Sequence, residues 1–301
     1  MRGNLCAVTL LALVGSNLAR GQEVRPLKLS LEPPEPSVYA LPEAPRPEEG
    51  VNLGGANIDL KVTYLSDYIY RGVNQSDFIG DVTGRSAQSR ANFQFDGKLE
   101  FNLDKFPHPF IGIFANVLDS DPISNFQEVR PYFGMEWRVR PFVFEVGNNI
   151  YSYPDRSALN TGELYARIKL DDSVILRRDE PLLSPYIYAA YDYDNYNGWY
   201  FEAGVSHEFV IEKTGITITA VANVAYVLGH GAFAGPTGRD TGFQHYEVGL
   251  IGRYSLNEVL NIPQRFGRWS INGYVNYTGQ IADNLRAEDA VWGGAGIEWQ
   301  Y

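Results

Sequence analysis

The sequence predicts an all-β protein: a single antiparallel transmembrane β-barrel of about twelve strands. Apolar and polar residues alternate with period two from residue 51 to the end, many alternating segments run ten residues or more, and the last segment ends on the aromatic Tyr301. Strands of soluble β-sandwiches, the alternative fold, usually run about 5–6 residues, whereas a tilted strand crossing a bilayer needs about 9–11. The sequence has no run of 18 apolar residues, which excludes a helical membrane protein.

We expect strands at twelve places, and an even number is typical of bacterial outer-membrane barrels. They lie at residues 58–70, 90–103, 109–118, 129–138, 142–151, 163–170, 185–193, 199–208, 216–226, 246–254, 269–277 and 291–301. The connections tend to alternate between short and long, as periplasmic turns and external loops do. The connections 171–184 and 255–266 are exceptions, since they are long on the side predicted to be periplasmic.

Charge and composition exclude nucleic acid as a partner. The chain of 301 residues carries 25 Lys plus Arg against 36 Asp plus Glu, a formal charge of −11. Affinity for a phosphate backbone comes mainly from cationic side chains, which are in the minority here. The aromatic content of 14% favours strands.

Three segments are predicted along the chain. Residues 1–21 have a basic start, a short apolar core and small residues near Gly21, which is typical of a cleaved secretory signal peptide. This segment also holds Cys6, the one cysteine of the sequence. Residues 22–50 are rich in Pro and Glu and should form an extended, disordered periplasmic arm, a spacer or a segment that binds a periplasmic partner. Residues 51–301 should form the barrel.

Charged residues of the polar parity should line the barrel lumen. The candidates are Asp67, Arg71, Lys98, Glu100, Arg130, Glu136, Arg167, Glu202 and Glu247. Buried charges without partners are unfavourable, so in an unbulged first strand Asp67 and Arg71 would each need a partner on a neighbouring strand. These side chains could close the lumen through ion pairs, or they could select the solutes that pass through it.

Aromatic residues predict the two membrane interfaces. Trp137, Trp269, Trp299 and Tyr301 should gather near one rim, and Trp199 and Trp292 near the other, as girdles of outer-membrane barrels do. The segment 296–301 resembles the terminal assembly signal of bacterial outer-membrane proteins. That resemblance implies recognition by the barrel-assembly machinery, with outer-membrane lipid around the barrel.

The segment Ser66-Asp67-Tyr68, Arg71-Gly72 and Gln75-Ser76-Asp77 resembles the opening motif of the TorF-type porin family of bacterial outer-membrane proteins. Asn74 stands where the family has Ser, and the match covers about a dozen residues. The resemblance implies an outer-membrane barrel with a channel role and no settled substrate.

We therefore expect a porin-like channel for passive diffusion of small hydrophilic solutes in a bacterial outer membrane. A closed barrel with a structural or docking role is the alternative. A lipid-modifying enzyme built on His245 and Glu247 fits less well, because no serine accompanies them at matching parity, and we expect no enzyme and no cofactor. We also expect no metal site, since the calcium-like segment 192–198 is interrupted by Tyr196 and is better explained as a turn.

Overall fold

The protein is a closed antiparallel β-barrel of twelve strands, as the sequence predicts. The computed structural model describes residues 55–75, 92–103, 106–118, 127–154, 157–211, 214–238 and 240–301. The expectations for residues 1–21 and 22–50, and for Ser76 and Asp77, lie outside the described residues. No helix in these ranges is long and apolar enough to cross a membrane.

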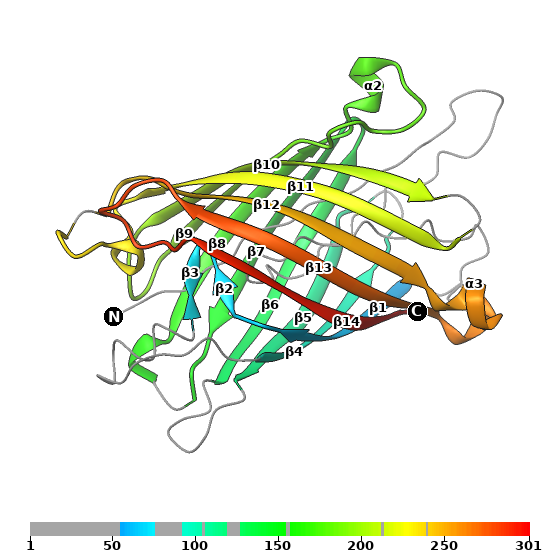
Figure 1. Ribbon diagram of the computed structural model, residues 1–301, viewed down its shortest axis with the longest axis horizontal. Helices are drawn as coiled ribbons and strands as arrows, with labels where there is room; N and C mark the ends of the chain where they lie inside the picture. Colours follow the sequence, from blue (N-terminus) through cyan, green and yellow to red (C-terminus); the bar gives the residue numbers. More distant parts are fainter. Residues whose placement is uncertain are drawn as a thin grey trace.

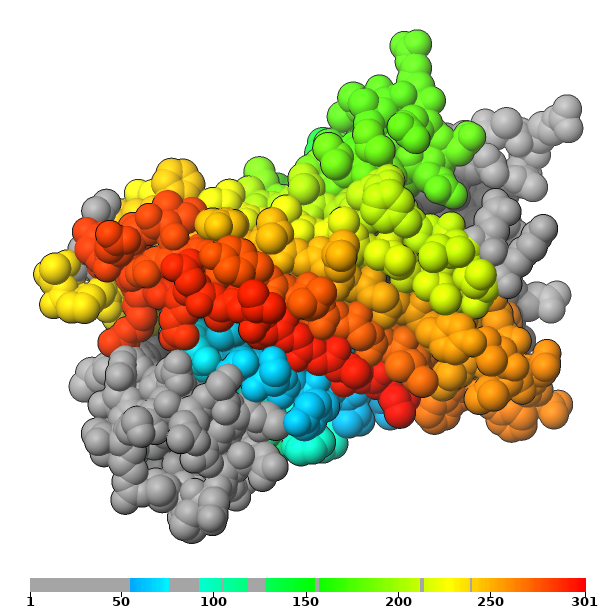
Figure 2. All heavy atoms as spheres, in the orientation of Figure 1, coloured from blue at the N-terminus to red at the C-terminus, as the bar shows by residue number. Residues whose placement is uncertain are grey.

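The barrel wall follows chain order, and each strand pairs with its sequence neighbours. Its strands are β1 (Ala56–Leu65), β4 (Asn92–Phe101), β5 (His108–Leu118), β6 (Gln127–Val139), β7 (Phe142–Tyr151), β8 (Thr161–Leu170), β9 (Tyr186–Asp192), β10 (Trp199–Ile211), β11 (Ile216–Leu228), β12 (Gly242–Ser255), β13 (Arg268–Gln280) and β14 (Ala290–Gln300). The first and last strands close the barrel from Asp59 opposite Gln300 to Leu65 opposite Gly294. In Figures 1 and 2 this seam is the line where blue meets red.

Short helices lie at the two rims of the barrel. The C-terminal rim, where β14 ends, carries α2 (Ser173–Leu176), α3 (Leu256–Leu260) and η3 (Gln264–Phe266), and Figure 1 shows α2 and α3 projecting beyond the strands. The two long connections that the sequence indicates at this rim are therefore partly helical. The opposite rim carries η1 (Ser157–Leu159) and η2 (Gly231–Phe233).

The apolar face of the barrel points outward. In β1 the side chains of Leu60 and Val62 are 46% and 47% exposed, whereas the alternating Lys61 and Thr63 are 6% and 3% exposed. The same inversion recurs around the wall, with exposed Phe93, Ile113, Phe133, Leu164, Ile187, Val248 and Ile297. This apolar shell around a polar interior is the pattern of outer-membrane barrels, because lipid-facing and lumen-facing residues alternate along each strand.

The predicted strand 58–70 is wrong at its end. β1 stops at Leu65, where Ser66 N–H donates to Gly293 O at 2.9 Å, and the chain then turns into the lumen. Residues 69–74 form a two-stranded sheet, β2 (Ile69–Tyr70) with β3 (Val73–Asn74), which Figure 1 shows inside the barrel. We call residues 66–75 the luminal hairpin. Its described residues from Asp67 onward are all buried, so the wall alternation does not continue through them.

Trp292 does not point outward as the interface prediction requires. Trp269 and Trp299 lie 6.1 Å apart at the C-terminal rim, and Trp299 stacks on Tyr301 at 5.7 Å. Trp199 is 41% exposed at the opposite rim, but Trp292 is only 1% exposed and faces the lumen. Its indole N–H donates to Thr278 Oγ1 at 3.1 Å. Trp292 shares its parity with the inward Glu298, so the alternation itself places it inside.

Candidate functional site

The luminal hairpin reverses direction through two residues in the left-handed conformation. Arg71 has φ 48° and Gly72 has φ 74°, the combination of a two-residue type I′ turn, whose twist matches that of paired strands. The turn is held against β12, because Gln244 Nε2 donates to Arg71 O at 2.9 Å. A Cβ on Gly72 would lie 2.6 Å from Cγ of His245, so only glycine fits this approach.

Arg71 projects from the turn into a set of groups on β7 to β10, which we call the guanidinium pocket. Glu163 on β8 pairs with Arg71: Nη2 donates to Oε1 at 3.2 Å, and Nη1 lies 3.0 Å from Oε2 as an ion-pair contact. Arg71 Nη2 also donates to the hydroxyl of Tyr188 at 3.0 Å. The ring of Tyr200 lies under the guanidinium, with Cζ 3.7 Å from its centroid. Bidentate carboxylate pairing and an aromatic face are the two interactions that suit a planar guanidinium.

The wall orients Glu163 independently of the hairpin. Tyr188 Oη donates to Glu163 Oε1 at 2.9 Å, and Asn149 Nδ2 donates to the same oxygen at 3.2 Å. Glu163 and Arg71 are both fully buried. Removing one member of a buried ion pair leaves an uncompensated charge, which typically destabilises a protein by about 3–5 kcal/mol. The pair therefore fixes the hairpin in the lumen.

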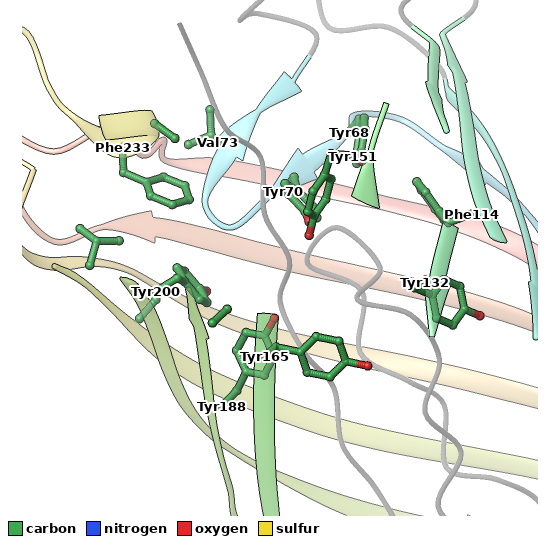
Figure 3. Close-up of a cluster of buried hydrophobic side chains, with 14 of the residues drawn as sticks. Tyr68, Tyr70, Val73, Phe114, Tyr132, Tyr151, Tyr165, Tyr188, Tyr200 and Phe233 are labelled. Carbon is green, nitrogen blue, oxygen red and sulfur yellow. The ribbon is translucent and has the colours of Figure 1, made fainter. Parts of the chain in front are cut away.

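The other face of the hairpin contacts β6 and β7. Tyr68 Oη donates to Glu128 at 2.7 Å, and Arg130 Nη1 donates to Tyr70 Oη at 2.6 Å. Tyr70 in turn donates to the hydroxyl of Tyr151 at 3.0 Å. Figure 3 shows Tyr68, Tyr70 and Tyr151 together on one side of the lumen, with Tyr188 and Tyr200 on the other. The hairpin thus spans the lumen between two sets of buried tyrosines.

The candidate charges nearer the C-terminal rim form a separate network. Glu100 pairs with Lys98 at 2.8 Å and with Arg138 Nη2 at 2.5 Å. Arg138 also binds Glu136, so the network joins β4 to β6 across the intervening strand β5. These side chains are buried from the exterior, as their parity predicts.

The remaining wall candidates bind partners on neighbouring strands. Arg167 pairs with Glu145 at 2.5 Å, and Tyr165 donates to the other oxygen of that carboxylate at 2.6 Å. Glu202 accepts from the hydroxyls of both Tyr186 and Tyr200, at 2.5 and 2.7 Å.

Glu247 and His245 lie together on β12, as the sequence predicts, and Thr278 Oγ1 donates to Glu247 at 2.9 Å. The distance from His245 Nε2 to Glu247 Oε1 is 4.0 Å. In the segment 192–198, Asp192 Oδ1 accepts the backbone N–H groups of Asp194 and Tyr196, at 3.2 and 2.9 Å. That carboxylate is therefore used within the turn, and the described residues hold no cluster suited to a metal ion.

The structure corrects the expected partners of Asp67 and Arg71. We expected both in the wall of the first strand with partners on adjacent strands. Arg71 instead reaches Glu163 on β8, which is not a neighbour of β1, and Asp67 accepts from Asn74 at 3.4 Å within the hairpin. The reason is the turn into the lumen after Leu65, which carries both side chains away from the wall.

Glu163, Tyr188 and Tyr200 are the functional residues missing from the sequence-based candidates. Their parity carried a usable indication, since each shares the inward face with a candidate charge: Glu163 with Arg167, and Tyr200 with Glu202. Tyrosines on the polar face of successive strands indicate a lumen partly filled by side chains. Which of these tyrosines contact Arg71 depends on the position of the luminal hairpin, and no local sequence pattern predicts that position.

His230 lies over the hairpin side of the lumen, beyond the end of β11. Its ring packs 4.7 Å from that of Phe233 and stacks 5.8 Å from that of Tyr196. Neither ring nitrogen has a hydrogen-bond partner among the described residues. Burial, together with the charge of Arg71, lowers the pKa of His230 to about 3. The imidazole is therefore neutral at ordinary pH.

Comparisons with known proteins identify no family: no family model matches the chain, and no curated protein matches it. Among solved structures it is similar to the COG4313 outer membrane channel from Pseudomonas putida F1, at 8% identity over 86% of this chain and 100% of that chain, with a TM-score of 0.44. It is also similar to LpxR from Salmonella typhimurium, at 11% identity over 80% and 99%, with a TM-score of 0.42. A refined porin structure shares 9% identity over 82% and 99%, with a TM-score of 0.30. The strand pairing shows a closed twelve-stranded barrel, and no specific family is identified for the chain.

Proposed function

We propose that the protein is a narrow channel for passive diffusion of small hydrophilic solutes across a bacterial outer membrane. The observation that carries this proposal is the charged inner wall, which extends from Glu163 and Arg130 on the hairpin side to Glu100 and Glu298 near the C-terminal rim. A buried ion pair is seldom more stabilising than well-packed apolar residues of the same volume. A barrel that only had to be stable would gain little from so many inward charges, whereas a passage for polar solutes needs them.

The luminal hairpin is the constriction in this proposal. Twelve strands lie between the eight of a filled barrel and the 16–18 of an open porin. A segment inserted into a lumen of that size controls what passes. The contacts of Tyr68, Tyr70 and Arg71 hold the hairpin in place, and conduction requires it to shift or be displaced.

The resemblance of residues 66–77 to TorF-type porins supports the same proposal. The alternating terminal strand β14 with its aromatic end supports insertion by the barrel-assembly machinery into outer-membrane lipid. An enzymatic role is not proposed, because acyl transfer by His245 and Glu247 needs a nucleophile, and no serine shares their parity nearby. Signal-peptide cleavage and a periplasmic partner for residues 22–50 remain predictions.

One observation favours a second candidate function, a closed barrel with a structural or docking role. The hairpin tyrosines and the wall residues around them form one buried cluster, with Tyr68, Tyr70, Tyr188 and Tyr200 fully buried. A permanently docked hairpin would close the lumen.

Planar-bilayer recording of the refolded mature protein tests the channel. A matched variant replaces residues 69–74 with two glycines, which is geometrically feasible because Gln75 N–H donates to Tyr68 O at 2.8 Å. We expect discrete conductance from the wild type and larger, less interrupted conductance from the shortened variant. Folding is checked by heat-modifiable migration in gels. Folded protein without conductance in either form would overturn the channel and favour the closed barrel.

A further inference from the structure

The guanidinium pocket has the composition of a ligand-binding site, and a side chain of the protein itself occupies it. Glu163 offers both carboxylate oxygens at 3.0–3.2 Å, Tyr188 adds a hydroxyl at 3.0 Å, and Tyr200 presents a ring face at 3.7 Å. Together they match one planar cation: a carboxylate for its charge and one N–H, a hydroxyl for a further N–H, and a ring for its flat face. An ammonium group would match the charge but not the fork or the stack.

The pocket belongs to the wall, whereas its occupant belongs to the hairpin. Asn149, Glu163, Tyr188 and Tyr200 come from the four consecutive strands β7, β8, β9 and β10, whose pairing does not involve the hairpin. Arg71 reaches the pocket from the hairpin turn, which Gln244 on β12 also holds. The pocket therefore takes none of its residues from the hairpin, and a displacement of the hairpin would empty it.

Glu163 differs from Glu128 and Glu145 in how it is neutralised. Arg130 pairs with Glu128 on its own strand at 3.5 Å, and Arg167 pairs with Glu145 on the adjacent strand. Among the described residues, the basic side chain that pairs with Glu163 is Arg71, which lies outside the wall. When the hairpin withdraws, Glu163 is left as a buried anion in the lumen, oriented by Tyr188 and Asn149. A solute cation that replaces Arg71 removes that penalty.

We propose that the guanidinium pocket binds solutes bearing a guanidinium or amidinium group, which compete with Arg71 and thereby release the luminal hairpin. This inference rests on the proposed channel and names the class of solute that it selects. The solute enters from the hairpin side of the lumen, pairs with Glu163 and stacks on Tyr200. Because Arg71 and the solute exclude each other, binding and opening are linked, and the pocket is specific for the group that resembles the side chain it displaces.

The variant Arg71→Gly tests the site without any measurement of conductance. It removes the occupant and suits the left-handed conformation at residue 71, so the type I′ turn is retained. We expect about 10 mM methylguanidinium chloride to raise the thermal unfolding midpoint of this variant by about 2–4 °C, and equal methylammonium chloride or sodium chloride to raise it by less than about 1 °C. Arg71→Asn replaces it if refolding fails, since Asn also tolerates this conformation.

Two matched controls separate the pocket from a general salt effect. Arg71→Gly combined with Glu163→Gln should lose the methylguanidinium response, because the neutral amide cannot pair with both N–H edges of a cation. Arg167→Ala also leaves a buried carboxylate, that of Glu145, without its arginine. An equal methylguanidinium shift in Arg167→Ala, or no shift in Arg71→Gly, would overturn the proposal.

A second measurement links the pocket to opening in the wild-type protein. In planar bilayers, methylguanidinium should raise the fraction of time spent open at least about threefold over methylammonium at the same concentration, and the Glu163→Gln variant should show no such difference. A thermal shift in Arg71→Gly without wild-type conductance would keep the binding site and reject the channel. Conductance without the thermal shift would keep the channel and reject the guanidinium site.

Discussion

The variant Gly72→Ala should release the luminal hairpin, and Gly238→Ala is its matched control. Both glycines have similar left-handed backbones, with φ of 74° and 78°. A Cβ at residue 72 would lie 2.6 Å from Cγ of His245, whereas nothing lies within 4 Å of a Cβ at residue 238. The two substitutions therefore share the backbone strain and differ in the steric clash.

The size of the effect follows from these two contributions. Left-handed backbone destabilises an alanine by about 1–2 kcal/mol at either site. Overpacking against the His245 ring adds about 1–3 kcal/mol at residue 72 alone. Since about 1.4 kcal/mol is a tenfold change in an equilibrium constant, the undocked fraction of the hairpin should rise roughly 5- to 150-fold more in Gly72→Ala than in Gly238→Ala.

Thiol labelling measures the undocked fraction directly. The sequence has its one cysteine at Cys6, within the predicted signal peptide, so Val73→Cys gives the refolded mature chain a single thiol on β3. Val73 is 6% exposed, so labelling by a maleimide should report opening of the hairpin. Adding His245→Ala should remove most of the acceleration caused by Gly72→Ala. Equal labelling rates in the Gly72→Ala and Gly238→Ala backgrounds would refute the docked geometry.

Three further predictions concern other parts of the barrel. Trp292→Ala should destabilise the barrel by about 3–5 kcal/mol, because it removes a buried ring. Trp269 is more exposed, so Trp269→Ala should destabilise the barrel by less than half as much. Urea unfolding in detergent measures both effects, and equal effects would contradict the luminal position of Trp292. His230 binds its proton more weakly in the folded state, with a pKa of about 3 against about 6.5 in the unfolded chain. Its contribution to the free energy of unfolding is therefore full above pH 6.5 and falls by about 1.4 kcal/mol per pH unit as the pH falls towards 3. Unfolding midpoints across this range should therefore fall more steeply for the wild type than for His230→Phe, and parallel curves would reject the shift. The Asp172 carboxylate accepts the N–H groups of Leu182 and Leu183 at 2.9 and 2.8 Å. Asp172→Asn should therefore weaken the connection that carries α2 by about 1–3 kcal/mol, seen as faster proteolysis between residues 173 and 183. An unchanged cleavage rate would show that these two hydrogen bonds are dispensable.

The wall of the barrel was predictable because its pattern is local. Each strand alternates between a lipid-facing and a lumen-facing side chain, and this alternation alone placed Lys98, Arg130 and Glu202 inside. The alternation also places Trp292 inside, whereas the usual preference of tryptophan for membrane interfaces predicts that it lies outside. The alternation of a strand was a better guide here than the general preference of the residue type.

The luminal hairpin was not predictable because its stability is not local. Each of its two strands is two residues long, and its turn is Arg-Gly rather than the common Asn-Gly or Asp-Gly. Its contacts join Arg71 to Glu163 and Tyr68 to Glu128, residues far apart in the sequence. The alternation with period two therefore predicts a first strand that runs to Tyr70, whereas the strand ends at Leu65 and the luminal hairpin follows it.

The position of the luminal hairpin has a consequence for how the barrel is assembled. The hairpin follows β1 directly, and its partners lie on β6 to β10 and on β12, across the lumen. Once β1 pairs with β14, the cylinder is complete, and a hairpin left outside would have to thread in through a rim. Docking before closure avoids this, and it brings β1 to a defined height opposite β6 to β10 while the last strand is still free. We therefore expect the docked hairpin to guide the curvature of the sheet before its two edges meet.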